Sequence, residues 1–171
     1  MAVKLFVLDV DGVMTDGGIL YTAHGEEQKR FHAHDGLGLK LLGKLGVALA
    51  VISGRESAPL VKRLDDLGIY HRRLKCGDKV SALTDICDEL DVSFEETAFM
   101  GDDLIDLAVM KACGYALAPS NAVFAVKEVA DWISVKEGGH GAVREACEHL
   151  AEKMGTSLVE VAPSVTKVLV Q

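Results

Sequence analysis

The stretch LFVLDVDGVMTDGG, residues 5–18, begins as a run of apolar residues and then places three aspartates within eight positions. Such a run predicts a buried strand whose carboxyl end carries Asp9, Asp11 and Asp16. Like charges repel each other and buried carboxylates are costly, so this crowding requires compensation. A divalent cation supplies it, because hard cations prefer oxygen ligands. The stretch therefore predicts a metal site at a strand end.

The length and hydropathy of the chain are those of a single domain. Its 171 residues, of which 49% are hydrophobic, suffice for a sizeable core, and we expect one domain spanning residues 1–171. No uninterrupted apolar run approaches the ~20 residues that span a bilayer. The N-terminal MAVKLFVLDVDG lacks the cleavage pattern of a signal peptide. We therefore expect a cytoplasmic protein with no membrane partner.

The charge and the cysteines narrow the class of partner. A formal net charge of −8 argues against a nucleic-acid partner, because Lys and Arg hold phosphate backbones. A phosphorylated small molecule stays possible, since a metal ion and a few cations make one pocket locally positive. The cysteines form neither a CxxC pair nor a zinc spacing, which predicts reduced, mostly buried thiols: Cys76, Cys87, Cys113 and Cys147.

Short apolar runs alternate with longer amphipathic stretches along the chain. This rhythm predicts βαβ units and a doubly wound, mostly parallel α/β sheet. The expected strands are 4–9, 47–53, 69–74, 97–101, 114–118 and 130–134. The expected helices are 36–45, 56–67, 79–90, 103–112, 122–128 and 141–153.

One segment interrupts this rhythm. GGILYTAHGEEQKRFHAHDG, residues 17–36, predicts two strands around the turn AHGE and hence an antiparallel hairpin, which is too small to be a domain. The C-terminal segment SLVEVAPSVTKVLVQ, residues 157–171, is compatible with a short helix, an extended tail or a subunit contact.

Polar residues gather at the predicted strand ends. Ser53 ends the second predicted strand, Lys79 begins a later helix, and Asp102 follows the fourth strand. In an open parallel sheet the carboxyl ends of the strands form the ligand site. A carboxylate at such a site attacks a phosphoryl group, and a second carboxyl group protonates the leaving alkoxide and later activates water. Ser53 and Lys79 are expected to stabilise charge on the transferring phosphoryl oxygens.

Four motifs then identify a family by resemblance. DVDGVMTDG (9–17), ISG (52–54), the isolated Lys79 and GDDLIDLA (101–108) resemble, in this order, those of the haloacid dehalogenase-like phosphohydrolases, along the whole chain. The resemblance implies a Rossmann-like fold with Asp9 as nucleophile and Asp11 as general acid and base. It also implies a Mg²⁺ ion held by Asp9, Asp102 and the backbone carbonyl of Asp11. Asp106, one turn after Asp102, would orient the metal site.

A narrower resemblance follows from the gaps between the motifs. Most family members insert a cap domain there, whereas these gaps contain only the hairpin and one βα unit, which predicts a capless member. Residues 29–42, 53–57, 61–69 and 138–145 are similar to the 3-deoxy-D-manno-octulosonate 8-phosphate phosphatases of lipopolysaccharide synthesis. In that family one subunit's hairpin and C-terminal region help to close a neighbour's active site. The resemblance thus implies a homotetramer acting on a phosphorylated sugar acid.

The same resemblance implies the substrate contacts. Carried over by position, they are Asp11, His32, Ala33, His34, Asp35, Gly36, Arg55, Arg63 and Lys79. Arg55 and Arg63 are expected to present cations to the substrate's carboxylate and phosphate groups. His32 and His34, two apart in an expected extended segment, share one face and favour a substrate or subunit contact over a metal site. An arginine is expected at His34, where the chain departs from the family.

Three alternatives stay open at this point. A phosphatase of a nonulosonate 9-phosphate shares the capless build, although a glutamate after Thr-Gly at the second motif is expected there and the chain has Arg55. A receiver domain is also doubly wound, but its phosphorylated aspartate follows the third strand, where only Asp78 is near. A regulatory protein without catalysis is expected to lack one of the four motif residues, and none is missing: Asp9, Asp11, Lys79 and Asp102.

Overall fold

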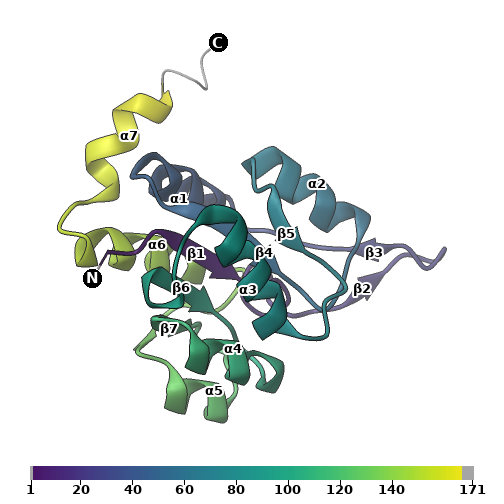
Figure 1. Ribbon diagram of the computed structural model, residues 1–171. Coiled ribbons are helices and arrows are strands. Elements are labelled where there is room, and N and C mark those ends of the chain that lie inside the picture. Colours follow the sequence, from purple (N-terminus) through teal and green to yellow (C-terminus); the bar gives the residue numbers. More distant parts are fainter. Residues whose placement is uncertain (1, 167–171) are drawn as a thin grey trace.

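The computed structural model describes residues 2–166 and is built on a six-stranded sheet (Figure 1). The strand order is β5-β4-β1-β6-β7-β8, and every neighbouring pair is parallel. The strands are β1 (Leu5–Leu8), β4 (Ala48–Ile52), β5 (His71–Arg73), β6 (Thr97–Met100), β7 (Tyr115–Ala118) and β8 (Trp132–Ile133). This confirms the doubly wound α/β fold, and residues 2–166 contain no cap domain.

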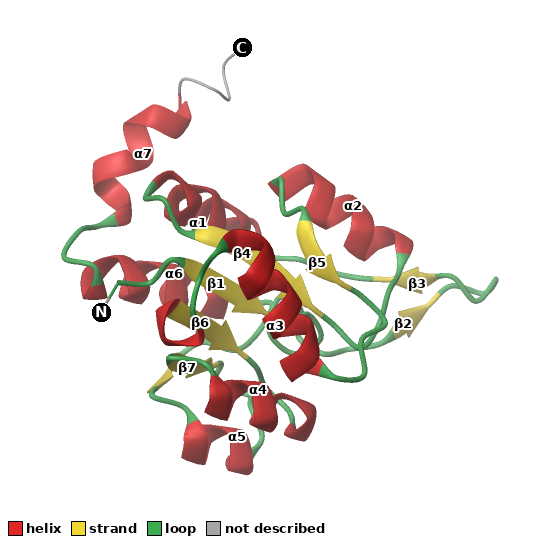
Figure 2. Cartoon of the chain, viewed as in Figure 1, coloured by secondary structure: helices red, strands yellow, loops and turns green. Residues whose placement is uncertain are grey.

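Helices cover both faces of the sheet (Figure 2). They are α1 (Ala33–Lys44), α2 (Ala58–Leu67), α3 (Lys79–Leu90), α4 (Leu107–Ala112), α5 (Phe124–Val129), α6 (Ala142–Lys153) and α7 (Leu158–Thr166), with the short 3-10 helices η1 (Phe94–Glu96) and η2 (Leu104–Asp106). Leu5 and Val7 of β1 pack in a core with α3, α4 and α5. Phe6 and Leu8 point the other way, into a core with α1, α2 and α6. Because both faces of β1 are buried, its sequence is continuously apolar.

The expected hairpin is present but shorter than residues 17–36. Its strands are β2 (Leu20–Tyr21) and β3 (Glu27–Gln28), which pair antiparallel and project beyond the sheet (Figure 1). The extended segment expected up to residue 36 is wrong, because α1 already begins at Ala33. Asp35 lies in the first helical turn, where its charge is favourable, and its Oδ1 accepts a hydrogen bond from the Arg144 N–H at 2.9 Å.

Other differences are local. The helix expected at 103–112 is divided into η2 and α4, because Asp103 caps η2 through the N–H of Leu104. The C-terminal segment forms α7, and its last residues, 167–171, lie outside the described part of the chain. All four cysteines are unpaired; Cys87 and Cys147 are buried, whereas Cys76 and Cys113 are half-buried. Among the described helices, none combines the length and the apolar character that crossing a membrane requires.

Candidate active site

Asp9 lies directly after β1, at the carboxyl edge of the sheet, and is 5% exposed. Its backbone N–H donates to the Met100 carbonyl at 3.0 Å, which ties it to the end of β6. The Lys79 ammonium group, at the first position of α3, lies 2.8 Å from Asp9 Oδ1 and 2.6 Å from Asp106 Oδ1. Both partners of this buried cation are carboxylates. The structure therefore brings together residues that the sequence places in three separate motifs.

Asp106 also organises the loop that carries Asp102. Its Oδ2 accepts hydrogen bonds from the backbone N–H groups of Asp102, at 3.0 Å, and Asp103, at 3.2 Å. With Lys79 on its other oxygen, the Asp106 carboxylate is fully engaged. This is the geometry of a group that orients its neighbours, as expected for Asp106 from the sequence.

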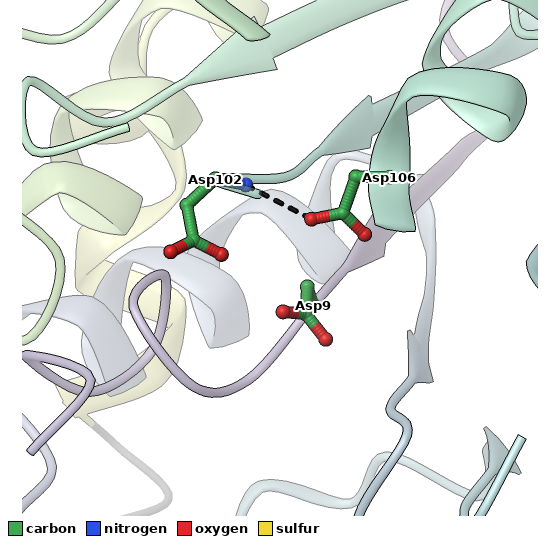
Figure 3. A group of neighbouring side chains, drawn as sticks. All are labelled: Asp9, Asp102 and Asp106. Atoms are coloured by element: carbon green, nitrogen blue, oxygen red, sulfur yellow. Dashed lines mark hydrogen bonds between the residues drawn. The ribbon is translucent and has the colours of Figure 1, made fainter. Parts of the chain in front are cut away.

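Three carboxyl groups converge at this point from separate elements (Figure 3). One oxygen from each of Asp9, Asp102 and Asp106 lies within 4.8 Å of the others. Asp102 Oδ1 is buried and has no hydrogen-bond partner among the described residues. Burial and the charge of Asp9 raise the pKa of Asp102 to about 7, and burial raises that of Asp9 to about 6 although Lys79 opposes the shift. An all-oxygen donor set with an unpartnered buried oxygen fits Mg²⁺.

Gly12 provides the close approach between the loop after β1 and this carboxylate group. Its φ is +90°, and a side chain at this position would overlap the Asp102 carboxylate. The Gly12 carbonyl accepts a hydrogen bond from Asn121 Nδ2 at 2.9 Å, and Asn121 Oδ1 accepts one from the Gly138 N–H at 2.6 Å. These contacts hold the first motif against two later loops.

Ser53 lies at the same carboxyl edge of the sheet as Asp9. It directly follows β4, which neighbours β1. It is buried, and its Oγ accepts a hydrogen bond from the backbone N–H of Arg55 at 3.2 Å. The Arg73 carbonyl accepts from the Ser53 N–H at 2.9 Å, so the loop after β4 is held on both sides.

Asp11 belongs to a second group of charges beside the first. Lys29 Nζ contacts Asp11 Oδ1 and lies 2.6 Å from Glu27 Oε1. Arg55 Nη2 donates to Glu27 Oε2 at 2.8 Å, and Arg55 Nε lies 3.7 Å from Asp11 Oδ2. Two carboxylates and two cations thus alternate around a closed ring. Two of its members, Glu27 and Lys29, come from the hairpin.

His32, Asp35 and Arg63 form a third group between α1 and α2. Arg63 Nη2 donates to the His32 carbonyl at 3.1 Å, while His32 Nδ1, Asp35 Oδ2 and Arg63 Nε are buried without partners among the described residues. Gly36 is buried against Arg63, whereas Ala33 and His34 are exposed. His34 still contacts the His32 ring edge to face, with centroids 5.1 Å apart.

Arg55 and Arg63 have different partners within the chain, and their contacts with the substrate stay a prediction. Arg55 contacts Asp11 and Glu27, but Arg63 contacts His32 and lies 5.7 Å from the centroid of the Phe31 ring. The reason is that Arg55 lies in the loop before α2, while Arg63 lies within the helix.

Sequence reasoning missed Lys29, Glu27 and Asn121. A signal for the first two existed, because residues two apart on a strand share one face and Glu27 and Lys29 have opposite charges. Asn121 follows the predicted strand 114–118, so its position at a strand end was also available as a signal.

A cleft of about 750 Å³ opens along the hairpin. It is lined by Asp16, Gly18, Ile19, Leu20, Glu27, Gln28, Lys29, Arg30 and Pro59. Asp9 is not among these residues, so the cleft lies outside the buried carboxylates. Because Lys29 lines the cleft and contacts Asp11, the two regions meet at the second charge group.

The arrangement is suited to phosphoryl transfer. Asp9 offers a carboxylate oxygen beside the Lys79 ammonium group, at a site where a bound metal ion would neutralise phosphoryl oxygens, and Asp11 offers a carboxyl group two residues away. A buried cation beside the attacking group stabilises charge that develops in the transition state more strongly than it would in water.

Comparison with known proteins agrees with this chemistry. A family model for haloacid dehalogenase-like hydrolases matches residues 74–145. The 3-deoxy-D-manno-octulosonate 8-phosphate phosphatase KdsC of Haemophilus influenzae is 41% identical over 157 residues, which are 92% of this chain and 87% of the relative. The same phosphatase from Escherichia coli K12 is 37% identical over 90% of this chain and 81% of its own length.

A solved structure extends the similarity to three dimensions. The phosphatase from Moraxella catarrhalis, crystallised with magnesium ion, phosphate ion and KDO, is 41% identical, covers 88% of this chain and 86% of its own, and has a TM-score of 0.85. The relatives and the shared fold support the same assignment. The chain belongs to the 3-deoxy-D-manno-octulosonate 8-phosphate phosphatase family of haloacid dehalogenase-like hydrolases.

Proposed function

We propose that this protein is a Mg²⁺-dependent phosphomonoesterase that hydrolyses 3-deoxy-D-manno-octulosonate 8-phosphate to the free sugar acid and phosphate, in lipopolysaccharide biosynthesis. The observation that carries the chemistry is the buried Lys79 ammonium group, 2.8 Å from Asp9 and 2.6 Å from Asp106, beside the unpartnered Asp102 oxygen. The substrate is supported by the relatives, which carry this activity in their names at 37–41% identity.

In this mechanism Asp9 attacks phosphorus, and the bond between phosphorus and the leaving oxygen breaks to form an aspartyl-phosphate. Asp11 donates a proton to the leaving oxygen and then accepts one from the water that hydrolyses the intermediate. Lys79, Ser53 and the backbone N–H groups after β4 hold the phosphoryl oxygens. Asp9, Asp102 and the backbone carbonyl of Asp11 would hold a Mg²⁺ ion, which would neutralise phosphoryl charge when bound.

The sugar acid requires contacts beyond the phosphoryl site. Asp11, Lys79, Arg55, Arg63 and the stretch His32–Gly36 are the proposed substrate contacts. Arg63 Nε, His32 Nδ1 and Asp35 Oδ2 support this assignment, because buried polar atoms without partners are suited to bind a polar ligand or water. The exposed side chains of Ala33 and His34 are suited to meet a neighbouring subunit.

We further propose a cytoplasmic homotetramer in which the hairpin completes a neighbouring site. Ile19, Leu20 and Tyr21, on and beside β2, are between 54% and 59% exposed, and a run of three exposed apolar side chains is typical of a contact surface. Without a cap, the sugar half of the substrate needs such a neighbour to enclose it.

The test is phosphate release from a panel of phosphorylated sugar acids and simple sugar phosphates, with Mg²⁺ and with a chelator. We expect the eight-carbon sugar acid phosphate to be preferred, turnover to require Mg²⁺, and Asp9→Asn to abolish it while keeping the fold. Arg55→Ala should lower kcat/KM for the sugar acid roughly ten- to a hundredfold and spare a small aryl phosphate. A preference for a nine-carbon acid, or none, would contradict the substrate assignment.

A further inference from the structure

Lys29 is a buried cation that the phosphoryl-transfer scheme does not use. Its side chain is 2% exposed, although it follows β3 in a hairpin whose other side chains are largely open to solvent. Burial opposes its charge, but hydrogen bonds to Asp11 and Glu27 outweigh this effect and raise the pKa of Lys29. A flexible lysine side chain loses rotamer freedom when it is buried in this way, so its position is determined by these two contacts.

Lys29 and Arg55 hold the Asp11 carboxyl group from two sides. Lys29 contacts Asp11 Oδ1, and Arg55 approaches the other oxygen, Asp11 Oδ2, at 3.7 Å. Glu27 connects the two cations, with Oε1 2.6 Å from Lys29 Nζ and Oε2 2.8 Å from Arg55 Nη2. The direction of the Asp11 carboxyl group is therefore held from the hairpin side and from the loop after β4 at once.

We propose that Lys29 is a positioning residue for Asp11, and that Glu27 in turn holds Lys29 and Arg55 on either side of that carboxyl group. This inference rests on the proposed function, in which Asp11 transfers a proton to the leaving oxygen. As the bond from phosphorus to that oxygen breaks, the proton moves from Asp11 to the oxygen, and Lys29 keeps its own protons. A displacement of about 1 Å at such a group costs on the order of a hundredfold in rate.

The leaving group distinguishes positioning from a structural role. A sugar phosphate releases a poor alkoxide that needs the proton, whereas p-nitrophenyl phosphate releases a stabilised phenolate that does not. The experiment measures kcat and KM of the parent and of Lys29→Met on both esters with saturating Mg²⁺. We expect kcat/KM on the sugar phosphate to fall about a hundredfold and kcat/KM on p-nitrophenyl phosphate to fall by less than about fivefold. The ratio kcat/KM is compared because it reports the steps up to formation of the aspartyl-phosphate, before Asp11 accepts a proton from water.

Matched variants complete the test. Lys29→Arg, which keeps the charge, should recover part of the lost rate. Lys62→Met removes an exposed lysine of α2 that pairs with Asp66 and should leave both esters unchanged. If thermal unfolding shows that Lys29→Met is destabilised, Glu27→Gln/Lys29→Met, which also removes the carboxylate that Lys29 no longer balances, should restore part of the stability and retain the difference between the esters.

Equal losses of kcat/KM on the two esters, or a raised KM with kcat unchanged on the sugar phosphate, would overturn the proposal. The substrate assignment fails in a different way, namely when the parent itself does not hydrolyse the sugar acid phosphate. In that case the same comparison is made with whichever sugar phosphate the parent hydrolyses, and the role of Lys29 is judged on that substrate.

Discussion

At the scale of single residues, Asp102 has the most perturbed environment in the candidate metal site. Burial, followed by the charges of Asp9 and Asp106, raises the pKa of its carboxyl group from 3.8 to about 7. A folded-state pKa above the unfolded value means that the folded protein prefers the protonated form. Metal-free protein therefore loses stability as the pH rises from about 4 through about 7, where Asp102 becomes ionised without a counterion.

Asp102→Asn should accordingly stabilise the metal-free protein at pH 8 and have little effect on its stability at pH 4. We expect a gain of about 1–2 kcal/mol, less than the full pKa shift implies, because Asp102 is partly exposed and solvent screens its charge. The measurement is thermal unfolding in a chelator at both pH values.

Magnesium supplies the control for this prediction. At pH 8, Mg²⁺ should raise the melting temperature of the parent and leave that of Asp102→Asn nearly unchanged, because the amide is a poor ligand. An equal rise in both proteins would place the metal elsewhere.

At the scale of secondary structure elements, α1 and α6 pack closely through a glycine. A Cβ atom built on Gly38 would lie 2.8 Å from Arg144 Cδ and 3.3 Å from Arg144 Cα. The same helix contains Gly43, where a Cβ atom would meet only Leu49 Cδ1, at 3.8 Å. The two positions share a helix and differ in the space available, so they form a matched pair.

Gly43→Ala should stabilise the protein by about 0.5–1 kcal/mol, since alanine favours the helix over glycine. Gly38→Ala gains the same helix preference, but its methyl group forces α6 away from α1. We therefore expect the free energy of unfolding to fall by about 1–2 kcal/mol. Urea unfolding with equal m-values measures the difference. Equal stabilities of the two variants would show that the approach of α6 imposes no constraint at Gly38.

At the scale of the whole molecule, the hairpin has two parts with different partners. Glu27 and Lys29 anchor its second strand to the chain's own Asp11 and Arg55, whereas Leu20 and Tyr21 on its first strand are exposed. This division is consistent with the proposed tetramer, in which the exposed strand contacts a neighbouring subunit.

Leu20→Asp should therefore dissociate the tetramer, because it buries a charge in an apolar contact. Analytical ultracentrifugation of the parent, of Leu20→Asp and of Val135→Asp measures this. Val135 is 82% exposed and lies after β8, outside the hairpin strands, so its variant should sediment like the parent. A parent that is a fully active monomer would refute the proposed assembly.

Much of the fold was predictable because its signals are local. The apolar run 4–9 and the alternation of strands with helices predicted the parallel sheet, and the structure confirms it. The hairpin boundary was wrong because α1 begins at Ala33, where packing of Gly36 against Arg63 and of Gly38 against Arg144 keeps both glycines within the helix. Helix preference at these residues is weak, so tertiary contacts decide the boundary.

The sequence by itself determined the order of the motifs and hence that Asp9, Ser53, Lys79 and Asp102 meet at one edge, because parallel strands carry their carboxyl ends to the same side of a sheet. Only the tertiary structure decided which charges face one another. Lys79 meets Asp106 across 27 positions and Lys29 meets Asp11 across 18. Such pairings depend on how α3 and the hairpin pack against the sheet. No local periodicity or residue spacing in the sequence predicts which of these charged side chains come into contact.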